Sequence, residues 1–150
     1  MGADHAELHE LHATAAERLR ADDQSYTASR RALVEALVDA ERPPTIPELL
    51  AARPGLAQSS AYRNLAVLEQ VGVVRRIVTS DEHARFELAE DLTGHHHHLV
   101  CGVCGRVDDF TVSPTLERSL DTALARVAEE TGFAVDHHRL DLVGTCSSCA

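Results

Sequence analysis

The N-terminal part of the chain carries apolar residues at helical spacing between clear turn signals. Over residues 4–21, Leu8, Leu11, Ala15 and Leu19 recur three or four positions apart and predict an amphipathic helix. A neighbouring face of this helix carries His5, His9 and His12. We interpret that face as solvated rather than metal-binding, although imidazoles at this spacing suit either role.

Capping and breaking residues divide the following stretch into three more helices and a hairpin. In chain order, the signals are an opening at Tyr26-Thr27-Ala28-Ser29, a stop at Pro43-Pro44, a cap at Thr45, a break at Pro54-Gly55, a cap at Ser59 or Ser60 and a stop at Gly72. Two β-prone segments, Val73–Val78 and Ala84–Leu88, then flank a polar turn over residues 79–82. These elements predict helices that end in a two-stranded wing.

This order of elements is typical of a winged helix-turn-helix, whose second helix enters the major groove of DNA. The start of the fourth helix offers the donors and acceptors that base contacts need, and the hairpin offers arginines for phosphate. A merely polar surface helix is the alternative, and the order of helices alone leaves both interpretations open. The candidate DNA-binding residues are Ser59, Ser60, Tyr62, Arg63 and Asn64 on the helix, and Arg75, Arg76 and Arg85 on the hairpin.

A short polar hinge, residues 89–94, separates this region from a second pattern. Strands are expected over residues 95–101, 106–112 and 133–143. Between them, Ser113 and Pro114 open a long helix that runs to Glu130 and ends at Gly132. The whole chain is therefore predicted to have an α+β fold, with a winged-helix unit over residues 1–88 and a small α/β unit over residues 95–150.

Length, composition and charge limit the number of domains, the location of the protein and the kind of partner that it binds. The chain has 150 residues, of which 44% are apolar, which suits one ordinary domain or two small ones. It shows no membrane-spanning run and no signal peptide, so we expect a cytoplasmic protein without a membrane partner. The net charge of −10 argues against a broadly basic nucleic-acid coat, but a local arginine cluster can still contact phosphates.

Two Cys-x-x-Cys pairs supply four thiols: Cys101, Cys104, Cys146 and Cys149. In a reducing compartment, this number and spacing favour a closed tetrahedral zinc site that stabilises the fold. A thioredoxin-like redox pair would need a βαβ setting that the pattern lacks, and four reduced bystander thiols are the other alternative. We expect antiparallel strands to bring the two pairs together.

Four consecutive histidines, residues 95–98, run directly into the first cysteine pair. Because successive side chains of a strand point to opposite faces, His95 and His97 would serve one face, and His96 and His98 the other. An internal run on a strand is better explained by metal ligation than by an expression tag. Further possible ligands nearby are Glu87, Asp108, Asp109, Glu117, His137 and His138. Imidazole with carboxylate suits zinc, iron or manganese, so ligand type does not choose the metal.

Four motifs together resemble the ferric uptake regulator family over roughly residues 20–149. They are SSAYRNL in the fourth helix, FEL at the end of the wing, HHHHLVCGVCGRVDDF, and TGFAVDHHRLDLVGTCSSC. The resemblance implies a homodimeric, metal-dependent repressor. Its winged helix would read double-stranded operator DNA, and its C-terminal α/β domain would dimerise and contain a zinc site made of the four cysteines.

The resemblance also implies three metal sites. Structural zinc would bind the four cysteines, a regulatory hinge site would use Glu87, His96, His98 and Asp109, and an additional site would use His95, His97, Glu117 and His138. The chain departs from the family at Pro43, Arg75 and Ala89, where other branches carry a His, an Asp and a Cys ligand. The hinge site is therefore short of one ligand, for which His83 or an N-terminal histidine could substitute.

These observations predict a metal-dependent repressor of metal-homeostasis genes. Its expected cofactors are structural zinc and a regulatory divalent metal, with zinc slightly favoured over ferrous iron and manganese a third choice. The alternatives are a peroxide-sensing regulator of the same family and a zinc-storage or metal-delivery protein. An enzyme with a small-molecule substrate is not expected, since the sequence shows no buried acid–base pair, nucleophile motif or phosphate loop.

Overall fold

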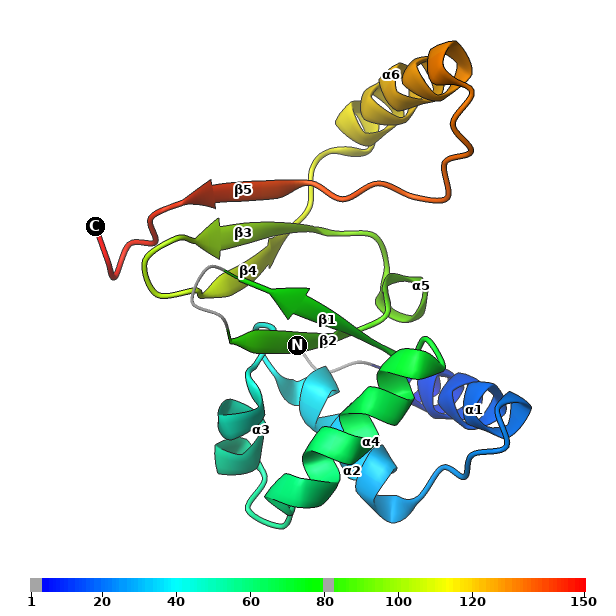
Figure 1. Ribbon diagram of the computed structural model, residues 1–150, viewed down its shortest axis with the longest axis vertical. Coiled ribbons are helices and arrows are strands. Elements are labelled where there is room, and N and C mark those ends of the chain that lie inside the picture. The colour runs from blue at the N-terminus through cyan, green and yellow to red at the C-terminus, as the bar shows by residue number, and fades with distance from the viewer. Residues whose placement is uncertain (1–3, 80–82) are drawn as a thin grey trace.

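The computed structural model describes residues 4–79 and 83–150 of the chain. Its elements are α1 (His5–Ala21), α2 (Ala28–Asp39), α3 (Ile46–Ala52), α4 (Gln58–Gln70), β1 (Val74–Val78), β2 (Ala84–Leu88), α5 (Glu90–Thr93), β3 (His97–Cys101), β4 (Val107–Phe110), α6 (Pro114–Thr131) and β5 (Asp141–Gly144). Figure 1 shows α1–α4 beneath the β1–β2 hairpin, with the three-stranded sheet above the hairpin and α6 extending away from it. The predicted α+β fold is confirmed.

Local capping explains where the N-terminal helices start. Asp4 and Glu7 form a reciprocal capping box at the start of α1. Thr27 caps α2 and Thr45 caps α3, each by accepting a hydrogen bond from a backbone N–H three residues on. The second helix ends at Asp39, before the proline pair that the sequence indicates as its stop.

The start of α4 differs from the prediction. The helix begins at Gln58 with Ala57 as its N-cap, so Ser59 and Ser60 lie inside the first turn. The Ser60 hydroxyl donates to the Ala57 carbonyl instead of accepting from the helix. At the other end, Gly72 takes a φ of 79°, a left-handed conformation that favours glycine and turns the chain into β1.

The wing forms as predicted on the described residues. Strands β1 and β2 pair antiparallel, with Arg75 opposite Glu87. Residues 80–82 of the expected turn lie outside the described residues. The predicted polar hinge contains one helical turn, α5, which ends at Gly94.

The C-terminal sheet has the order β4-β3-β5. Strand β3 pairs antiparallel with β4 but parallel with β5, which corrects the expected all-antiparallel arrangement. The last strand is also shorter than residues 133–143, because only Asp141–Gly144 reach the edge of β3. Parallel pairing places the C-terminal ends of β3 and β5 side by side, and a cysteine pair lies at each of those ends.

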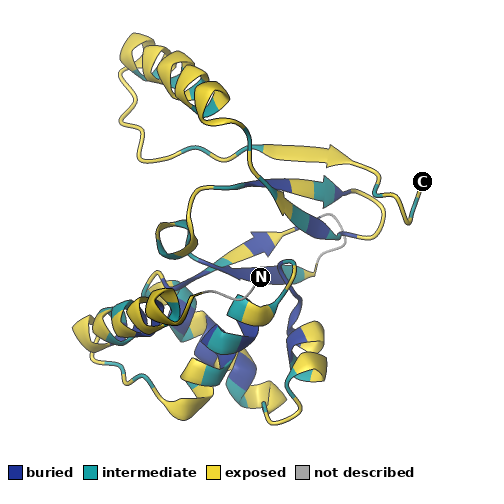
Figure 2. Ribbon diagram, turned by 180° about the vertical axis from the view of Figure 1, so that it is seen from behind, coloured by how far each residue is buried: buried dark blue, intermediate teal, exposed yellow. Residues whose placement is uncertain are grey.

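The apolar core lies almost entirely in the N-terminal unit. Its fully buried side chains include Leu19, Leu33, Leu49, Leu65 and Leu68, which join α1, α2, α3 and α4. In contrast, α6 has no buried residue and β5 is exposed throughout, as Figure 2 shows. Among the described residues, no helix is both long and apolar enough to cross a membrane.

His12 joins α1 to the rest of the N-terminal unit. It is 6% exposed, its Nδ1 lies 2.6 Å from the Tyr26 hydroxyl, and its Nε2 lies 3.5 Å from a Glu35 oxygen. Burial, followed by the charge of Arg31, lowers the pKa of His12 below 6.5, and Glu35 offsets this only in part. His12 is therefore held neutral when α1 is packed.

The lowered pKa of His12 predicts that the folded chain loses stability as the pH falls. As pH falls below 6.5, the unfolded chain binds a proton at His12 that the folded chain resists, so His12 lowers stability on acidification. We expect the difference in unfolding free energy between wild type and His12→Gln to shrink from about pH 7.5 to about pH 5.5. Urea titrations at both pH values measure it; a difference that stays constant or grows on acidification contradicts the assignment.

Candidate metal centres and DNA interface

The structure brings the twelve predicted metal-binding side chains into three clusters, and within each cluster the four ligand atoms lie within 4.8 Å of one another. The cysteine cluster contains Cys101, Cys104, Cys146 and Cys149; the hinge cluster contains Glu87, His96, His98 and Asp109; the inner cluster contains His95, His97, Glu117 and His138. Each four-residue set is the one expected from the sequence.

The cysteine cluster lies at the shared end of β3 and β5. The Sγ atoms of Cys104 and Cys146 are 3.8 Å apart, and the Cys146 N–H points to the Cys101 sulfur at 3.4 Å. Backbone hydrogen bonds, first from Cys104, lower the pKa of the Cys101 thiol to about 6. The neighbouring thiols, first Cys146, raise the pKa of Cys149 to about 12. Four sulfurs at this spacing cannot all ionise without a cation, and tetrahedral Zn²⁺ fits the set.

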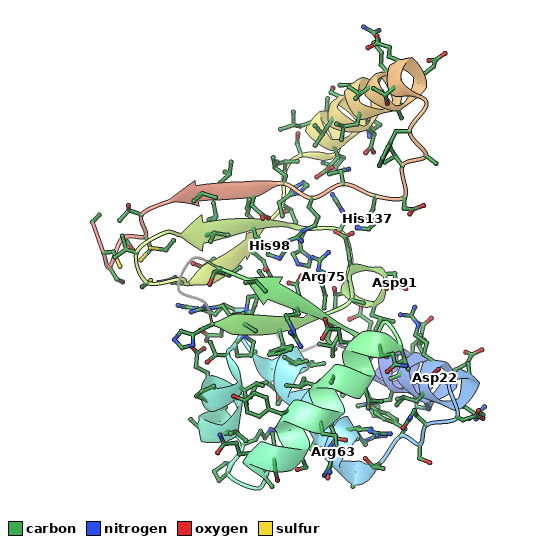
Figure 3. All side chains as sticks on the ribbon, in the orientation of Figure 1. Asp22, Arg63, Arg75, Asp91, His98 and His137 are labelled. Atoms are coloured by element: carbon green, nitrogen blue, oxygen red, sulfur yellow. The ribbon has the colours of Figure 1, made fainter. Side chains whose placement is uncertain are left out.

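The hinge cluster joins the wing to the C-terminal sheet. Glu87 on β2 presents Oε2 to the Nε2 atoms of His96 and His98, each 3.0 Å away. Oδ1 of Asp109 on β4 lies 3.7 Å and 3.6 Å from the same two nitrogens. In Figure 3, His98 and Arg75 lie between the hairpin and the sheet. Four ligand atoms from two parts of the chain therefore converge on one point.

Hydrogen bonds and burial shift the pKa values of three side chains in the hinge cluster. Burial opposes ionisation of Glu87, but hydrogen bonds from His96, His98 and Arg75 outweigh it and hold the pKa of Glu87 far below its ordinary range. The hydrogen bond to Glu87 raises the pKa of His96 to about 9. Burial raises the pKa of Asp109. His96 thus carries a proton near neutral pH that a divalent cation would displace.

The second ring nitrogens of both hinge histidines have partners. His96 Nδ1 lies 3.1 Å from the Gly94 carbonyl, and His98 Nδ1 lies 3.5 Å from Asp141 Oδ1. Such partners orient metal-binding histidines and leave Nε2 free for the metal. Neither Gly94 nor Asp141 was predicted from the sequence. Asp141 lies opposite His98 only because β5 pairs parallel with β3.

A cavity of about 680 Å³ borders the hinge cluster. Glu87, His96 and Asp109 line it, and so does Pro43, the position at which the sequence lacks a ligand. Glu7 and Glu10 of α1 also line this cavity, whereas His5, His9 and His12 do not. His83 precedes Glu87 by four residues along the wing, roughly 13 Å in extended chain. Neither suggested substitute therefore joins the cluster in this structure.

The inner cluster is centred on Glu117 of α6. Its Oε1 contacts His97 Nε2, and its Oε2 lies 3.4 Å from His95 Nε2 and 3.6 Å from His138 Nε2. His97 Nδ1 and His138 Nε2 are buried without a hydrogen-bond partner. A buried imidazole nitrogen without a partner is costly, and a bound cation would satisfy the one on His138. Strand alternation separated these two faces correctly, although β3 itself begins only at His97.

The candidate DNA face is smaller than predicted. On α4, Tyr62 is 54% exposed, and Arg63 points away from the protein at the lower edge in Figure 3. Asn64 differs from the expectation, because it is only 9% exposed and accepts a hydrogen bond from Arg30 Nε at 3.1 Å. Ser59 is exposed on the first turn of the helix. Arg30, which the sequence did not single out, therefore holds the candidate recognition helix to α2.

The wing arginines are also bound within the protein. Arg75 forms an ion pair with Glu87, and Arg76 forms one with Glu69 at 3.2 Å. Arg85 is buried and donates to the Thr79 hydroxyl. Arg75 and Arg85 thus lie in internal contacts rather than on the surface expected for phosphate binding. Arg76 remains half-exposed and accessible.

Comparison with known proteins agrees with this architecture. A model of the Ferric uptake regulator family matches residues 22–143. The chain belongs to the ferric uptake regulator family. The "Peroxide operon regulator" of Bacillus subtilis is 32% identical over 146 residues, covering 95% of this chain and 94% of that protein.

Solved structures of the ferric uptake regulator family share the fold. A ferric uptake regulator from Pseudomonas aeruginosa with manganese is 26% identical, with a TM-score of 0.68 over 87% of this chain and 96% of that one. The Helicobacter pylori ferric uptake regulator is 20% identical, with a TM-score of 0.73 over 95% and 93% of the two chains. The resemblance inferred from the sequence motifs is confirmed.

Proposed function

We propose that this member of the ferric uptake regulator family is a homodimeric transcriptional repressor that binds operator DNA when a divalent metal occupies the hinge cluster. The observation that carries the proposal is the origin of the four ligands. Glu87 belongs to the winged-helix unit, whereas His96, His98 and Asp109 belong to the C-terminal unit. One ion bound by all four would tie the two units together.

The proposed mechanism is a shift between two arrangements. Without metal, the hinge is held only by hydrogen bonds and ion pairs, so the units sample several relative positions. With Glu87 and the two histidines bound to one cation, a closed arrangement is favoured, and the two α4 helices of a dimer can meet successive turns of DNA. The ligands must lose their protons for this to occur, so binding is weaker at low pH.

The exposed apolar residues of the C-terminal unit support dimerisation. They lie on β3, α6, β5 and the segments between them, and no comparable group lies on the helices of the N-terminal unit among the described residues. Exposed apolar side chains that gather in one part of a protein are typical of an association site. The residues are Leu99, Val103, Leu116, Val127, Phe133, Val135, Leu142 and Val143.

Zinc is the favoured regulatory metal, with ferrous iron second and manganese third. The four hinge ligands each offer one atom, and mixed nitrogen and oxygen sets of four suit tetrahedral zinc. A second candidate, a peroxide-sensing regulator, is favoured by the name of the Bacillus subtilis relative. It requires a redox-active metal, such as ferrous iron, at the hinge site, because zinc has no redox chemistry.

A gel shift with the protein's own promoter tests the proposal. Zinc-loaded protein should retard the promoter fragment, protein treated with a chelator should not, and added zinc should restore binding. A storage or delivery protein would bind metal without retarding DNA under either condition. Retardation that is equally strong with and without metal removes the regulatory role.

Peroxide separates the two regulatory candidates. Protein loaded anaerobically with ferrous iron and then exposed to hydrogen peroxide should lose promoter binding if it senses peroxide. Zinc-loaded protein is the matched control, because zinc has no redox chemistry. Equal, lasting promoter binding by both forms after peroxide favours the metal-sensing function.

The exposed part of α4 gives a prediction about DNA recognition. Tyr62→Ala and Arg63→Ala should each weaken promoter binding by roughly 1–3 kcal/mol, because each removes a contact while leaving the buried face of the helix intact. Asn64→Ala should act differently, by loosening the helix at Arg30. Anisotropy titrations with promoter DNA measure the loss, and metal content serves as the control. Wild-type affinity in both exposed-residue variants would mean that α4 is not the reading helix.

A further inference from the structure

The carboxylate of Glu87 is divided between two sets of partners. Its Oε2 faces the histidines of the hinge cluster, and its Oε1 faces Arg75 on the neighbouring strand. Both Nε and Nη2 of Arg75 donate to that oxygen, at 2.9 Å and 2.5 Å. Because Arg75 and Glu87 stand directly opposite each other in the hairpin, the pairing is built into the register of the wing.

This contact is protected from water. Glu87 is 8% exposed, and the Arg75 side chain is mostly covered. A guanidinium that places two donors on one carboxylate oxygen forms a strong, directional contact. The oxygen bound to Arg75 is therefore not readily available to a metal, and Glu87 can offer the hinge site only Oε2.

We propose that Arg75 sets the metal preference of the hinge site by holding Glu87 to a single ligand atom. With Glu87 restricted in this way, the cluster offers four ligand atoms, one from each side chain. Four ligands suit zinc, whereas manganese and iron commonly take six, with more oxygen atoms. A Glu87 freed from Arg75 could use both oxygens and would suit the larger coordination number. The inference rests on the proposed role of the hinge cluster as a metal site.

The positive charge of Arg75 also affects how tightly the hinge site binds any divalent ion, and this effect differs from the effect on metal preference. A cation beside Glu87 lowers the affinity of the site for every divalent ion by a similar electrostatic amount. The ratio of two divalent metal affinities cancels that shared contribution. The ratio of zinc to manganese affinity therefore reports on the geometry that Arg75 imposes.

The test compares Arg75→Met with Arg76→Met. Arg76 is the next residue on β1, points to the other face of the strand, and contacts Glu69 and the Phe86 ring rather than Glu87. Both changes remove one positive charge, but only the first frees Oε1. Zinc and manganese affinities would be measured by competition with a chromophoric chelator. A His97→Ala background keeps the inner cluster from competing.

We expect Arg75→Met to lower the zinc-to-manganese affinity ratio at least about tenfold, and Arg76→Met to leave it unchanged. An unchanged ratio in Arg75→Met would overturn the proposal, and if both affinities fell equally, Arg75 would only orient Glu87. If Arg75→Met does not fold, the same affinity ratio would be measured for Arg75→Lys. It keeps the charge but not the paired donors, so a lower ratio supports the proposal and a wild-type ratio overturns it.

These measurements use no DNA and so are independent of the proposed regulatory function. If promoter binding proves insensitive to metal while the ratio shifts as expected, the repressor mechanism fails and the role of Arg75 stands. If promoter binding follows metal but the affinity ratio does not shift, the role of Arg75 fails and the repressor mechanism stands.

Discussion

Changing Cys146 to Ser is expected to unfold the C-terminal unit and abolish dimer formation. This unit buries few apolar side chains of its own, and β5 is held only at the edge of β3. The proposed zinc at the cysteine cluster would join the ends of these two strands. Structural zinc supplies on the order of 10 kcal/mol of folding free energy in small zinc-bound units, so losing one ligand should have a severe effect.

The effect is measured by zinc content, size-exclusion chromatography and thermal melting. Ser147→Ala is the matched control, since Ser147 lies in the same turn between the two cysteines and offers no thiol. It should melt like wild type. A Cys146→Ser protein that remains dimeric with an unchanged melting temperature contradicts a structural zinc site.

Changing His96 to Ala should have the second large effect, the loss of metal-activated promoter binding. His96 Nε2 contacts Glu87, the one member of the described hinge cluster that comes from the wing, at 3.0 Å. Without this imidazole, the site retains three ligands, and the tie between the two units weakens. The gain in DNA affinity on adding metal, roughly 5- to 150-fold in typical coupled systems, should disappear.

His97→Ala is the control on the opposite face of the same chain segment. His97 contacts Glu117 in the inner cluster, away from the wing. Its removal should shift the metal concentration needed or the dimer stability, while metal still activates DNA binding. Promoter titrations against free zinc and against anaerobic ferrous iron compare the two variants. If His97→Ala is inactive and His96→Ala behaves like wild type, the assignment of the two faces is wrong.

The local patterns of the chain are enough to predict most elements and the division of the four histidines, whereas the other members of the hinge and inner clusters were expected from the family resemblance. Alternation alone separates the four histidines into two pairs, and the structure places each pair with the expected carboxylates. Thr45 and Ser113 are caps where the sequence indicates them. These features depend on near neighbours in the chain, so a single sequence carries them.

Features that depend on distant pairing were missed. The parallel pairing of β5 depends on where α6 returns the chain, and no local signal records that. The sequence predicts the α6 helix, but the structure buries none of its residues, which agrees with the proposed dimer, in which a partner chain would cover it. The Arg75–Glu87 pair could have been predicted, since both residues lie six positions from residue 81, the midpoint of the gap between the two predicted strands.

The coupling between metal and DNA at the hinge is tested most directly by a closed thermodynamic cycle. Zinc affinity would be measured with and without saturating promoter DNA, and promoter affinity with and without zinc, in a His97→Ala background that leaves the hinge site intact. We expect DNA to tighten zinc binding by the same factor by which zinc tightens DNA binding, and His96→Ala to reduce both factors to one. A zinc affinity that DNA leaves unchanged would contradict regulation through the hinge.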